Sequence, residues 1–432
     1  MDLKPTKPLS GFIELLPAQQ RCFDYCADCM ENVLISSGFS MLDLPAIERA
    51  EVLTDKDNWD EIETQMFLFQ KGDTKMGLRY DGTVGLSRYV AGHLNNLVFP
   101  FRASQFSKRY RGERAQRGRY REFYQMDLDI MGINSLSTNY DAEIISVINR
   151  ALDSVAKFIG PSVVLVGSRP FWDALFEFLD LNAEQKKSVF VLIDKKDKMG
   201  DADFSDGLTD ALGDVNKENL IKSVFVDGYE NFMNKSEKLD AAISELTDFM
   251  NLLNAIGVKN AKIDLSVARG LAYYTGLVFE FKLVNHPELG TAAGGGRYEN
   301  LASKFSKTKI VGVGAAIGFS RIFASMLENN QIDLSSFEKN VNVAVLIMGQ
   351  QNVPYAMNVV SQLRNEWIVA VPYLDTDKKF KNQIEYADKI GAQFSMIIGD
   401  DEVAKNQVAL KNMETGDQKN LSVADAIKEM AK

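Results

Sequence analysis

The chain has 432 residues, of which 46% are hydrophobic and 25% charged, and its formal net charge is −10. This length predicts two or three domains, and the composition, which has no biased tract, is that of a soluble globular protein. The acidic total argues mildly against a free-standing nucleic-acid module, which would be basic.

No apolar stretch approaches the roughly 18–20 residues of a membrane helix, so we expect no membrane association. The segment Met1–Ser10 has neither an apolar signal core nor an Arg-rich transit pattern. A cytoplasmic protein is therefore expected.

The first predicted element is an amphipathic helix over Gln19–Leu34, which carries all the cysteines of the chain, Cys22, Cys26 and Cys29. Their C-x3-C-x2-C spacing is also that of the iron–sulfur ligands in radical S-adenosylmethionine enzymes. Positions i, i+4 and i+7 share one helical face, and buried cysteine is common. Those enzymes usually have an aromatic residue before the third cysteine, where this chain has Asp28. We therefore favour core packing over a cluster.

The next elements predict an antiparallel sheet with helices outside it. After an extended segment at Gly38–Pro45, the strand patterns are Gln65–Phe69, Met76–Asp81, Gln105–Arg111 and Arg121–Ile130, and the helical patterns are Thr83–His93 and Asn139–Gly160. The polar segment Gly112–Arg119 suits a hairpin loop. Hairpin-like connections between strands favour an α+β domain.

The second half begins with short apolar runs that alternate with Lys- and Asp-rich stretches, from about residue 162 to 260, which we interpret as an inserted helical subdomain. Strand patterns return at Ile263–Val267 and Tyr273–Val284, and Gly312–Ser325 passes from a glycine-rich stretch into a helix. Beyond a polar boundary near Glu328–Asn340, strands and helices alternate at Val341–Met348, Val353–Asn365, Ile368–Tyr373, Lys378–Ile390 and Gln393–Ile398. This alternation predicts a small α/β domain with a largely parallel sheet.

The most informative stretch is Lys108–Arg121, KRYRGERAQRGRYR, which holds six arginines and one lysine against a single glutamate, Glu113. A solvated basic loop would be the ordinary explanation. Arginine in place of lysine suits bidentate phosphate contacts, and two tyrosines interleave with the arginines. The stretch therefore indicates a polyanion partner, either ATP phosphates or an RNA end.

The strand that follows, Arg121–Ile130, alternates between two kinds of side chain. Arg121, Phe123, Gln125, Asp127 and Asp129 share one face, and the opposite face is mainly apolar. Gln125 and Asp129 lie about 13 Å apart along such a strand. We predict that this polar face lines a ligand site and contacts the two ends of a small polar ligand.

At this point the sequence resembles motif 2 of the class II aminoacyl-tRNA synthetases, in its histidyl form, over YRGERAQRGRYREFYQMDLDIMG. The resemblance implies that Arg111 contacts the α-phosphate and the amino-acid carboxylate, that Gln125 holds the α-amino group, and that Asp129 binds the imidazole. It further implies that Glu113 and Arg119 lie near ATP, and that Gln116 and Arg121 approach the acceptor end of tRNA.

The segment RGLAYYTGLVFE, Arg269–Glu280, resembles the signature peptide of histidyl-tRNA synthetases. Two tyrosines in a strand are by themselves more often core residues. The resemblance implies that Arg269 bridges the α-phosphate and the carboxylate, and that Tyr273 and Tyr274 line the histidine pocket. Ala272 departs from the family, which normally has aspartate there, and our hypothesis is that this aspartate plays a supporting role.

Further segments extend the resemblance to about residues 1–160 and 261–432. LRYDGT resembles the amino-acid loop, with Asp81 and Thr83 at the positions that bind the substrate amino group. GGGRY, Gly294–Tyr298, resembles a strand under the nucleotide, where missing side chains let a ligand approach the backbone. GVGAAIGFSRI resembles motif 3, with Arg321 over the γ-phosphate and Ser320 where an acid is common. Gly38–Pro45 resembles motif 1, whose proline lies at a dimer interface.

As a whole, the resemblance implies an antiparallel class II catalytic domain over residues 1–328, with the insertion at about 162–260, and an anticodon-binding α/β domain over 340–432. It implies a homodimeric enzyme that uses ATP and Mg²⁺, activates L-histidine and loads it onto tRNA(His). We expect no other bound metal, because two histidines and three helical cysteines leave no convincing zinc site. The alternative is a related, non-catalytic protein, the regulatory subunit of ATP phosphoribosyltransferase, which keeps the fold but typically loses the anticodon domain.

Overall fold

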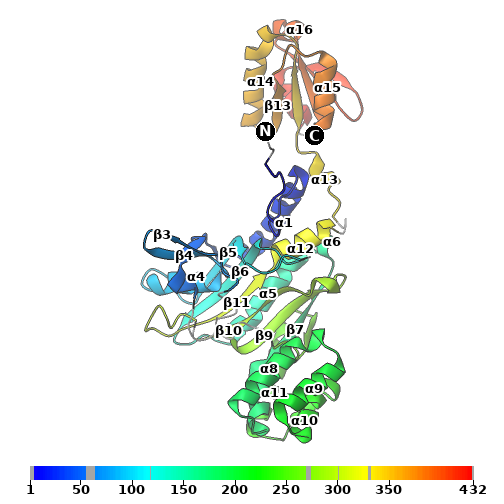
Figure 1. The fold of residues 1–432 in the computed structure, drawn as a ribbon. Helices are drawn as coiled ribbons and strands as arrows, with labels where there is room; N and C mark the ends of the chain where they lie inside the picture. Colours follow the sequence, from blue (N-terminus) through cyan, green and yellow to red (C-terminus); the bar gives the residue numbers. More distant parts are fainter. Residues whose placement is uncertain are drawn as a thin grey trace. The chain divides into compact units, whose positions relative to one another are not determined.

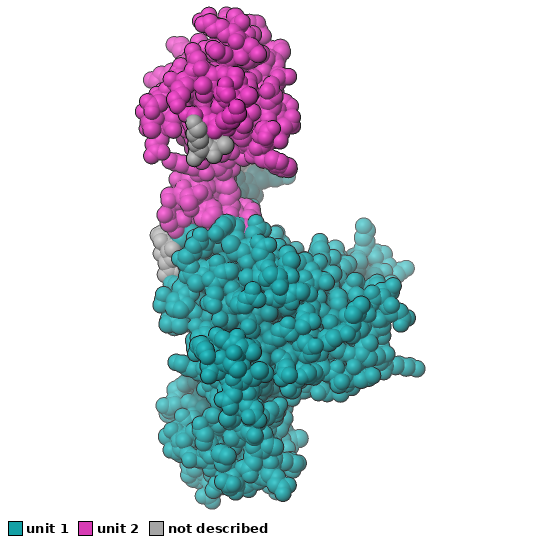
Figure 2. Space-filling model, turned by 180° about the vertical axis from the view of Figure 1, so that it is seen from behind, with its two compact units in different colours: residues 1–14, 25–332 teal, residues 15–24, 333–432 magenta. Residues whose placement is uncertain are grey.

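The computed structural model describes residues 4–54, 64–116, 118–268, 274–299, 301–328 and 332–430. They divide into two compact units, one of residues 1–14 and 25–332 and the other of residues 15–24 and 333–432 (Figure 2). Helix α1, Pro17–Ser36, contributes its first turns to the second unit and the rest to the first. Cys22 and Cys26 are buried in this helix, and the described residues hold no group of three His, Cys, Asp or Glu side chains that could bind a metal. Cys22 and Cys26 thus lie where core packing predicts them, and Cys29 is partly buried.

The first unit is built on an eight-stranded sheet, with the order β1-β5-β6-β11-β10-β9-β7-β8 (Figure 1). Its strands are β1 Ser40–Met41, β5 Phe101–Tyr110, β6 Glu122–Ile133, β7 Ser162–Ser168, β8 Ala261–Ile263, β9 Tyr274–Leu283, β10 Thr291–Tyr298 and β11 Ile310–Ile317. The six central strands run antiparallel, and β1 and β8 add to the edges in parallel. The α+β class and the antiparallel sheet predicted from the sequence are confirmed.

Strand β6 shows why this sheet forms. Its apolar face presents Met126, Leu128 and Ile130, all with 0% of their surface exposed. Helices α5, Asn139–Ser154, and α12, Phe319–Glu328, pack against β6 and its neighbours. The opposite, polar face of β6 carries Gln125, Asp127 and Asp129, because side chains alternate along a strand.

The small elements before this sheet form a three-stranded sheet, β2-β4-β3, and two helices. They are β2 Ile47–Arg49, α2 Ala50–Leu53, β3 Leu68–Lys71, β4 Thr74–Leu78 and α4 Thr83–Gly92. The predicted strands at Gln65–Phe69 and Met76–Asp81 are displaced, because the turn between them is tight and uses Gly72 at φ 59°. Strand β4 therefore ends before Asp81.

The helices after β7 form a cluster that packs beside β9 and β8 (Figure 1). They are α7 Arg169–Phe178, α8 Ala183–Lys195, η1 Lys196–Lys198, α9 Asp201–Leu212, α10 Val215–Val226, η2 Tyr229–Phe232 and α11 Glu237–Ala255. Residues 162–168 belong to the central sheet as β7, so the helical part of the chain begins at Arg169.

Two further elements differ in extent from the prediction. The single helix over Asn139–Gly160 is two helices, α5 and α6, Ala156–Ile159, because Val155 leaves the helical conformation at φ −117° and ψ 13°. The strand predicted over Ile263–Val267 stops at Ile263. Asp264 instead makes a turn, in which its Oδ1 accepts hydrogen bonds from the backbone N–H (3.0 Å) and the hydroxyl (2.6 Å) of Ser266.

The second unit contains a five-stranded sheet with the order β13-β12-β14-β15-β16. Its elements are α13 Ser335–Glu338, β12 Val343–Ile347, η4 Gln350–Asn352, α14 Val353–Asn365, β13 Ala370–Tyr373, α15 Phe380–Lys389, β14 Phe394–Ile398, α16 Asp400–Ala404, β15 Val408–Asn412, β16 Gln418–Leu421 and α17 Val423–Met430. Strands β13, β12 and β14 are parallel, as predicted, whereas β15 and β16 are antiparallel additions.

The first unit also contains the short 3-10 helix η3, Pro287–Leu289, which lies between β9 and β10.

Candidate active site

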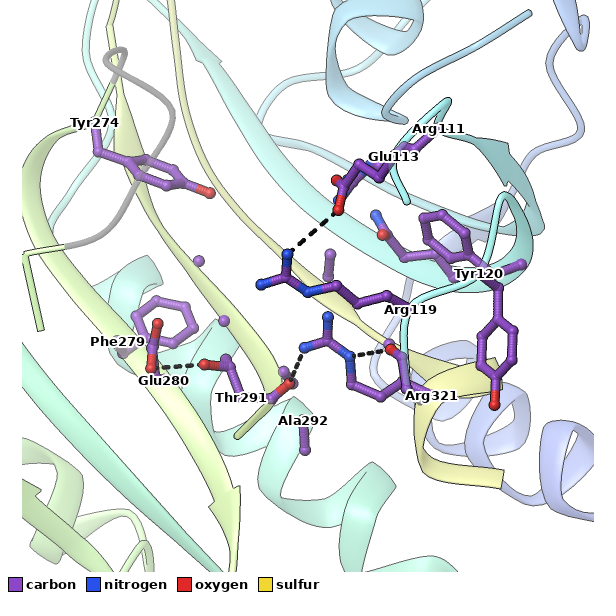
Figure 3. Close-up of a pocket in the computed structure, with 18 residues that line it drawn as sticks. Arg111, Glu113, Arg119, Tyr120, Tyr274, Phe279, Glu280, Thr291, Ala292 and Arg321 are labelled. Carbon is purple, nitrogen blue, oxygen red and sulfur yellow. Dashed lines mark hydrogen bonds and ion pairs between the residues drawn. The ribbon is translucent and has the colours of Figure 1, made fainter. Parts of the chain in front are cut away.

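A cavity of about 400 Å³ opens on the polar face of the large sheet. It is bounded by the hairpin between β5 and β6, by strands β6, β9, β10 and β11, and by the start of α12 (Figure 3). The sequence-predicted residues on its wall are Arg111, Glu113, Arg119, Gln125, Tyr274 and Arg321. Residues up to 210 positions apart in the chain are thus brought to one cavity, from both the motif 2 and the motif 3 segments.

The floor of the cavity is made of residues with little or no side chain, among them Gly294, Gly295 and Ala316. A Cβ atom on Gly295 would lie 2.1 Å from the carbonyl oxygen of Gly314, far inside contact distance. The glycine run at 294–296 therefore lies within strand β10 and not in a turn, and a side chain at Gly295 would clash with the neighbouring strand β11.

The arginines on the wall are held by backbone oxygens and carboxylates. Arg321 donates from Nε to the carbonyl of Gly118 and from Nη1 to that of Thr291, both at 2.9 Å. Arg119 lies 3.5 Å from a carboxylate oxygen of Glu113 and extends toward the middle of the cavity (Figure 3). These contacts fix the hairpin over β10 and leave a cationic cavity suited to phosphates.

Arg111 reaches the cavity across an aromatic surface. Its guanidinium carbon lies 4.6 Å from the ring centre of Tyr80 and 5.2 Å from that of Phe123. Nε also donates weakly to the carbonyl of Tyr80, at 3.4 Å. The faces of these two rings favour a cation between them and orient the guanidinium group of Arg111.

The polar face of β6 is divided by depth. Gln125 lies on the cavity wall, whereas Asp129 is 1% exposed and does not line the cavity. Asp129 Oδ1 accepts a hydrogen bond from the hydroxyl of Tyr298 at 2.8 Å, and Oδ2 is buried without a hydrogen-bond partner among the described residues. Burial raises the pKa of Asp129 well above its usual value, and the nearby Asp127 adds to the effect.

Asp81 and Thr83 also lie away from the cavity wall. Thr83 is the first residue of α4, and Asp81 Oδ1 accepts from the backbone N–H of Val84 at 2.9 Å, next to the start of that helix. Burial raises the pKa of Asp81, and Asp127 raises it further. The fold thus places Asp81 next to the β6 network without bringing it to the wall.

The two residues predicted for the tRNA end lie on the hairpin outside the cavity. Gln116 is exposed and exchanges backbone hydrogen bonds with Arg119, at 3.1 and 2.8 Å. Arg121 donates from Nε to the carbonyl of Glu113 at 3.0 Å, and its backbone N–H donates to Gly11 at 2.8 Å. Arg269, Ala272 and Tyr273 lie outside the described residues.

Sequence reasoning gave no role to several residues of this site. Tyr120, Phe279, Glu280 and Thr291 all line the cavity, as does Phe123, which strand alternation had already placed on the polar face. Glu280 is 6% exposed and its carboxylate accepts from the hydroxyl of Thr291 at 2.8 Å. A signal existed for Glu280, since an acid within the strand pattern Tyr273–Val284 needs a polar partner.

Comparison with known proteins gives this geometry a family. A family model for histidyl-tRNA synthetase matches residues 11–322, and a model for an anticodon-binding domain matches residues 342–432. The histidine–tRNA ligase of Clostridium tetani is 37% identical over 438 residues, which cover 99% of this chain and 98% of that protein. The chain belongs to the histidyl-tRNA synthetase family. It is therefore an aminoacyl-tRNA synthetase with the class II fold.

Solved structures agree with this assignment. The histidyl-tRNA synthetase of Nostoc sp. PCC 7120 has a TM-score of 0.84 and 30% identity, with 99% of each chain covered. A Bacillus halodurans protein described as an ATP phosphoribosyltransferase regulatory subunit/histidyl-tRNA synthetase covers 85% of this chain and 93% of its own, with a TM-score of 0.69 and 21% identity. The likeness to the Bacillus halodurans protein shows the fold alone, so it does not favour a regulatory subunit over a synthetase.

The cavity also suits the magnesium ion that accompanies a nucleotide. Mg²⁺ in such sites is held by one or two carboxylates together with substrate phosphates. Glu113 and Glu280 supply carboxylates to a wall whose other charged groups are arginines.

Within the described ranges, no helix is long and apolar enough to cross a membrane.

Proposed function

We propose that this synthetase activates L-histidine with ATP to histidyl-adenylate and transfers the histidyl group to the 3′ end of tRNA(His). The observation that carries the proposal is the cavity itself. It combines Arg111, Arg119 and Arg321 with a glycine floor and with the polar face of β6. Family membership supplies the reaction class, and the residues on the wall support the activation step.

In the first step, a carboxylate oxygen of histidine attacks the α-phosphorus of ATP. The new P–O bond forms as the bond to the bridging oxygen of the β-phosphate breaks, and pyrophosphate leaves. Two anions must meet, so the demand is for cations and for positioning. Arg111 and Arg269 would contact both the carboxylate and the α-phosphate, and no side-chain nucleophile is needed.

The remaining cavity residues would hold ATP. Arg321 would bind the γ-phosphate, and Glu113 and Arg119 would lie at the nucleotide. Glu113 and Glu280 would hold Mg²⁺, which when bound would offset phosphate charge.

Recognition of histidine would come from the polar face of β6 and its neighbours. Gln125, Asp81 and Thr83 would hold the α-amino group. Asp129, Tyr273 and Tyr274 would contact the imidazole ring or line its pocket. The buried Oδ2 of Asp129, which no described residue bonds, supports a ligand hydrogen bond there.

In the second step, a hydroxyl oxygen of the terminal tRNA ribose attacks the carbonyl carbon of the adenylate. AMP leaves and the hydroxyl proton is released. Gln116 and Arg121 would approach the acceptor end. We propose a catalytic domain over residues 1–328, with the insertion at about 162–260, an anticodon-binding domain over 340–432, and a homodimer in which Pro45 lies near the interface.

The first step is tested by ATP–pyrophosphate exchange on purified protein, with Mg²⁺ and each amino acid in turn. We expect exchange with histidine only. Arg269→Ala should abolish exchange while the protein stays folded. Absence of histidine-dependent exchange in the unaltered protein would overturn the proposal and favour the regulatory alternative.

A further inference from the structure

A buried ion pair lies directly behind Gln125. The guanidinium of Arg109 contacts Asp127 Oδ2, and the two side chains are 0% and 3% exposed. Arg109 also donates from Nη1 to the hydroxyl of Ser107 at 2.7 Å. Neither Arg109 nor Asp127 lines the cavity, and the family resemblance gives neither a role.

Stability alone gives no reason for this pair. Removing two charges from water costs about as much as their attraction returns, so a buried ion pair is weak evidence for stabilisation. The pair also restricts its neighbours. A Cβ atom on Gly82, in the loop before α4, would lie 2.5 Å from Arg109 Nη2 and 2.6 Å from Asp127 Oδ2. Only glycine therefore fits at this position beside the pair. Such a costly, closely fitted pair indicates a role in positioning.

The contact that Asp127 makes toward the cavity shows what is positioned. Gln125 Nε2 donates to Asp127 Oδ1 at 2.5 Å. An ionised carboxylate can only accept hydrogen bonds, and Arg109 already occupies its other oxygen. The amide of Gln125 must therefore turn its nitrogen toward Asp127. Its Oε1 has no hydrogen-bond partner among the described residues and is left to accept a bond from a ligand on the cavity side.

We propose that Asp127, held by Arg109, is a positioning residue that fixes the amide orientation of Gln125, so that the site presents an oxygen acceptor and selects ligands that carry an α-ammonium group. This inference rests on the proposed function, because it assumes that Gln125 faces the amino group of histidine. A reversed amide would point its NH₂ group at the ammonium, and two donors repel.

The test is the binding of two histidine analogues, measured by titration calorimetry. Histidinol keeps the ammonium and lacks the carboxylate, whereas imidazolepropionate keeps the carboxylate and lacks the ammonium. In Asp127→Asn, the new amide can give its oxygen to Arg109 and its nitrogen to Gln125, which reverses the glutamine. We expect histidinol to bind roughly tenfold or more weakly, as for loss of a hydrogen bond to a charged group, and imidazolepropionate to bind as before.

A compensating double variant distinguishes a change in the orientation of residue 125 from a general disruption of the site. Gln125→Glu alone places two carboxylates in contact and should weaken histidinol binding. In Gln125→Glu combined with Asp127→Asn, the amide at position 127 can donate to the carboxylate at position 125, whose second oxygen can accept from the ligand. The double variant should therefore recover most of the lost histidinol affinity. This comparison does not depend on Asp127→Asn alone, because the double variant keeps one carboxylate at positions 125 and 127, as the unaltered protein does.

The matched control is Asp141→Asn, which alters another buried pair of similar exposure, Arg297–Asp141, whose side chains are 10% and 3% exposed. It should leave the ratio of the two analogue affinities unchanged. Equal weakening of both analogues in Asp127→Asn, or a double variant no better than Gln125→Glu alone, would refute the positioning role. Histidine-dependent exchange by the unaltered protein is measured separately, so failure of the proposed function shows there and not in the ratio.

Discussion

The packing beneath the site depends on the absence of a side chain at Gly314 in strand β11. Gly314 stands opposite Asp129 in the ladder between β11 and β6. A Cβ atom on Gly314 would lie 1.9 Å from Asp129 Oδ1, the oxygen that accepts from Tyr298. Glycine at this position is what allows a carboxylate to stay buried beside the strand.

We therefore expect Gly314→Ala to displace Asp129 from Tyr298. Overpacking of this kind costs about 1–3 kcal/mol of unfolding free energy. Because Asp129 is assigned to the imidazole, KM for histidine should rise about tenfold or more while KM for ATP changes little. Exchange kinetics and thermal unfolding measure the two effects. Gly92→Ala is the control, since nothing lies within 4 Å of a Cβ there, and equal histidine KM in both variants would contradict the argument.

Arg321 links the hairpin loop to β10 through two backbone carbonyls, those of Gly118 and Thr291. Lysine has one nitrogen and cannot make both bonds while also facing a phosphate. Arg321→Lys should raise KM for ATP about tenfold, as for loss of a charged hydrogen bond, and leave KM for histidine nearly unchanged. Exchange rates at varied ATP give the answer. A larger change in KM for histidine than for ATP would show that this arginine serves the amino-acid side.

The elements that carry the site were the most predictable parts of the chain. Alternation along Arg121–Ile130 and the basic loop before it gave the β5–β6 hairpin and the polar face of β6. The side chains of that face are as predicted, but they differ in depth, because Phe123 and Gln125 lie on the wall whereas Asp129 is buried. Periodicity reports which side of a strand a residue takes, whereas depth depends on Tyr298 and Gly314 from distant strands.

The partners of the arginines could not be predicted for the same reason. Arg321 is held by Gly118 and Thr291, and Arg109 by Asp127, and each contact forms only once the sheet is assembled. The break in the helix at Val155 and the turn at Asp264 are local, yet each depends on a cap or turn that periodicity does not detect.

The packing of α5 on β10 predicts a pH dependence. Asp141 on α5 contacts Arg297 on β10 at 2.6 Å. Burial raises the pKa of Asp141 from 3.8 to about 6 despite the arginine, so between these values the folded protein binds a proton that the unfolded chain has lost. The contribution of this carboxyl to stability is therefore fully present at low pH and falls as pH rises toward about 6.

In Asp141→Asn this dependence is removed. The unfolding free energy of the unaltered protein, relative to the variant, should fall by on the order of 3 kcal/mol between about pH 4 and 7. Denaturant titrations of both proteins across that range provide the measurement. A difference that stays constant with pH would mean that Asp141 is ionised with its ordinary pKa.

Each of the two units has its own sheet and core, and the family models divide the chain in nearly the same place, at residues 322 and 342. In the sequence, we predicted a domain boundary in the polar stretch near Glu328–Asn340. The participation of α1 in both units was not predictable, since helical periodicity does not state which core each turn joins.

The motif 1 segment predicts a homodimer. Pro45 is exposed in the single chain, and Ile47 beside it exposes 48% of its surface. An exposed apolar residue beside the motif 1 proline fits an interface that a second copy covers. Light scattering coupled to gel filtration should give twice the mass of one chain at micromolar concentration. A mass of one chain across that range would contradict the assignment.

The most direct measurement is the transfer of labelled histidine to tRNA. Purified protein is mixed with ATP, Mg²⁺, labelled amino acid and either tRNA(His) or a different tRNA. The account predicts acid-precipitable label with histidine and tRNA(His), none with other amino acids, and little with the other tRNA. Failure to charge tRNA(His) by a folded protein that binds ATP and histidine would contradict it.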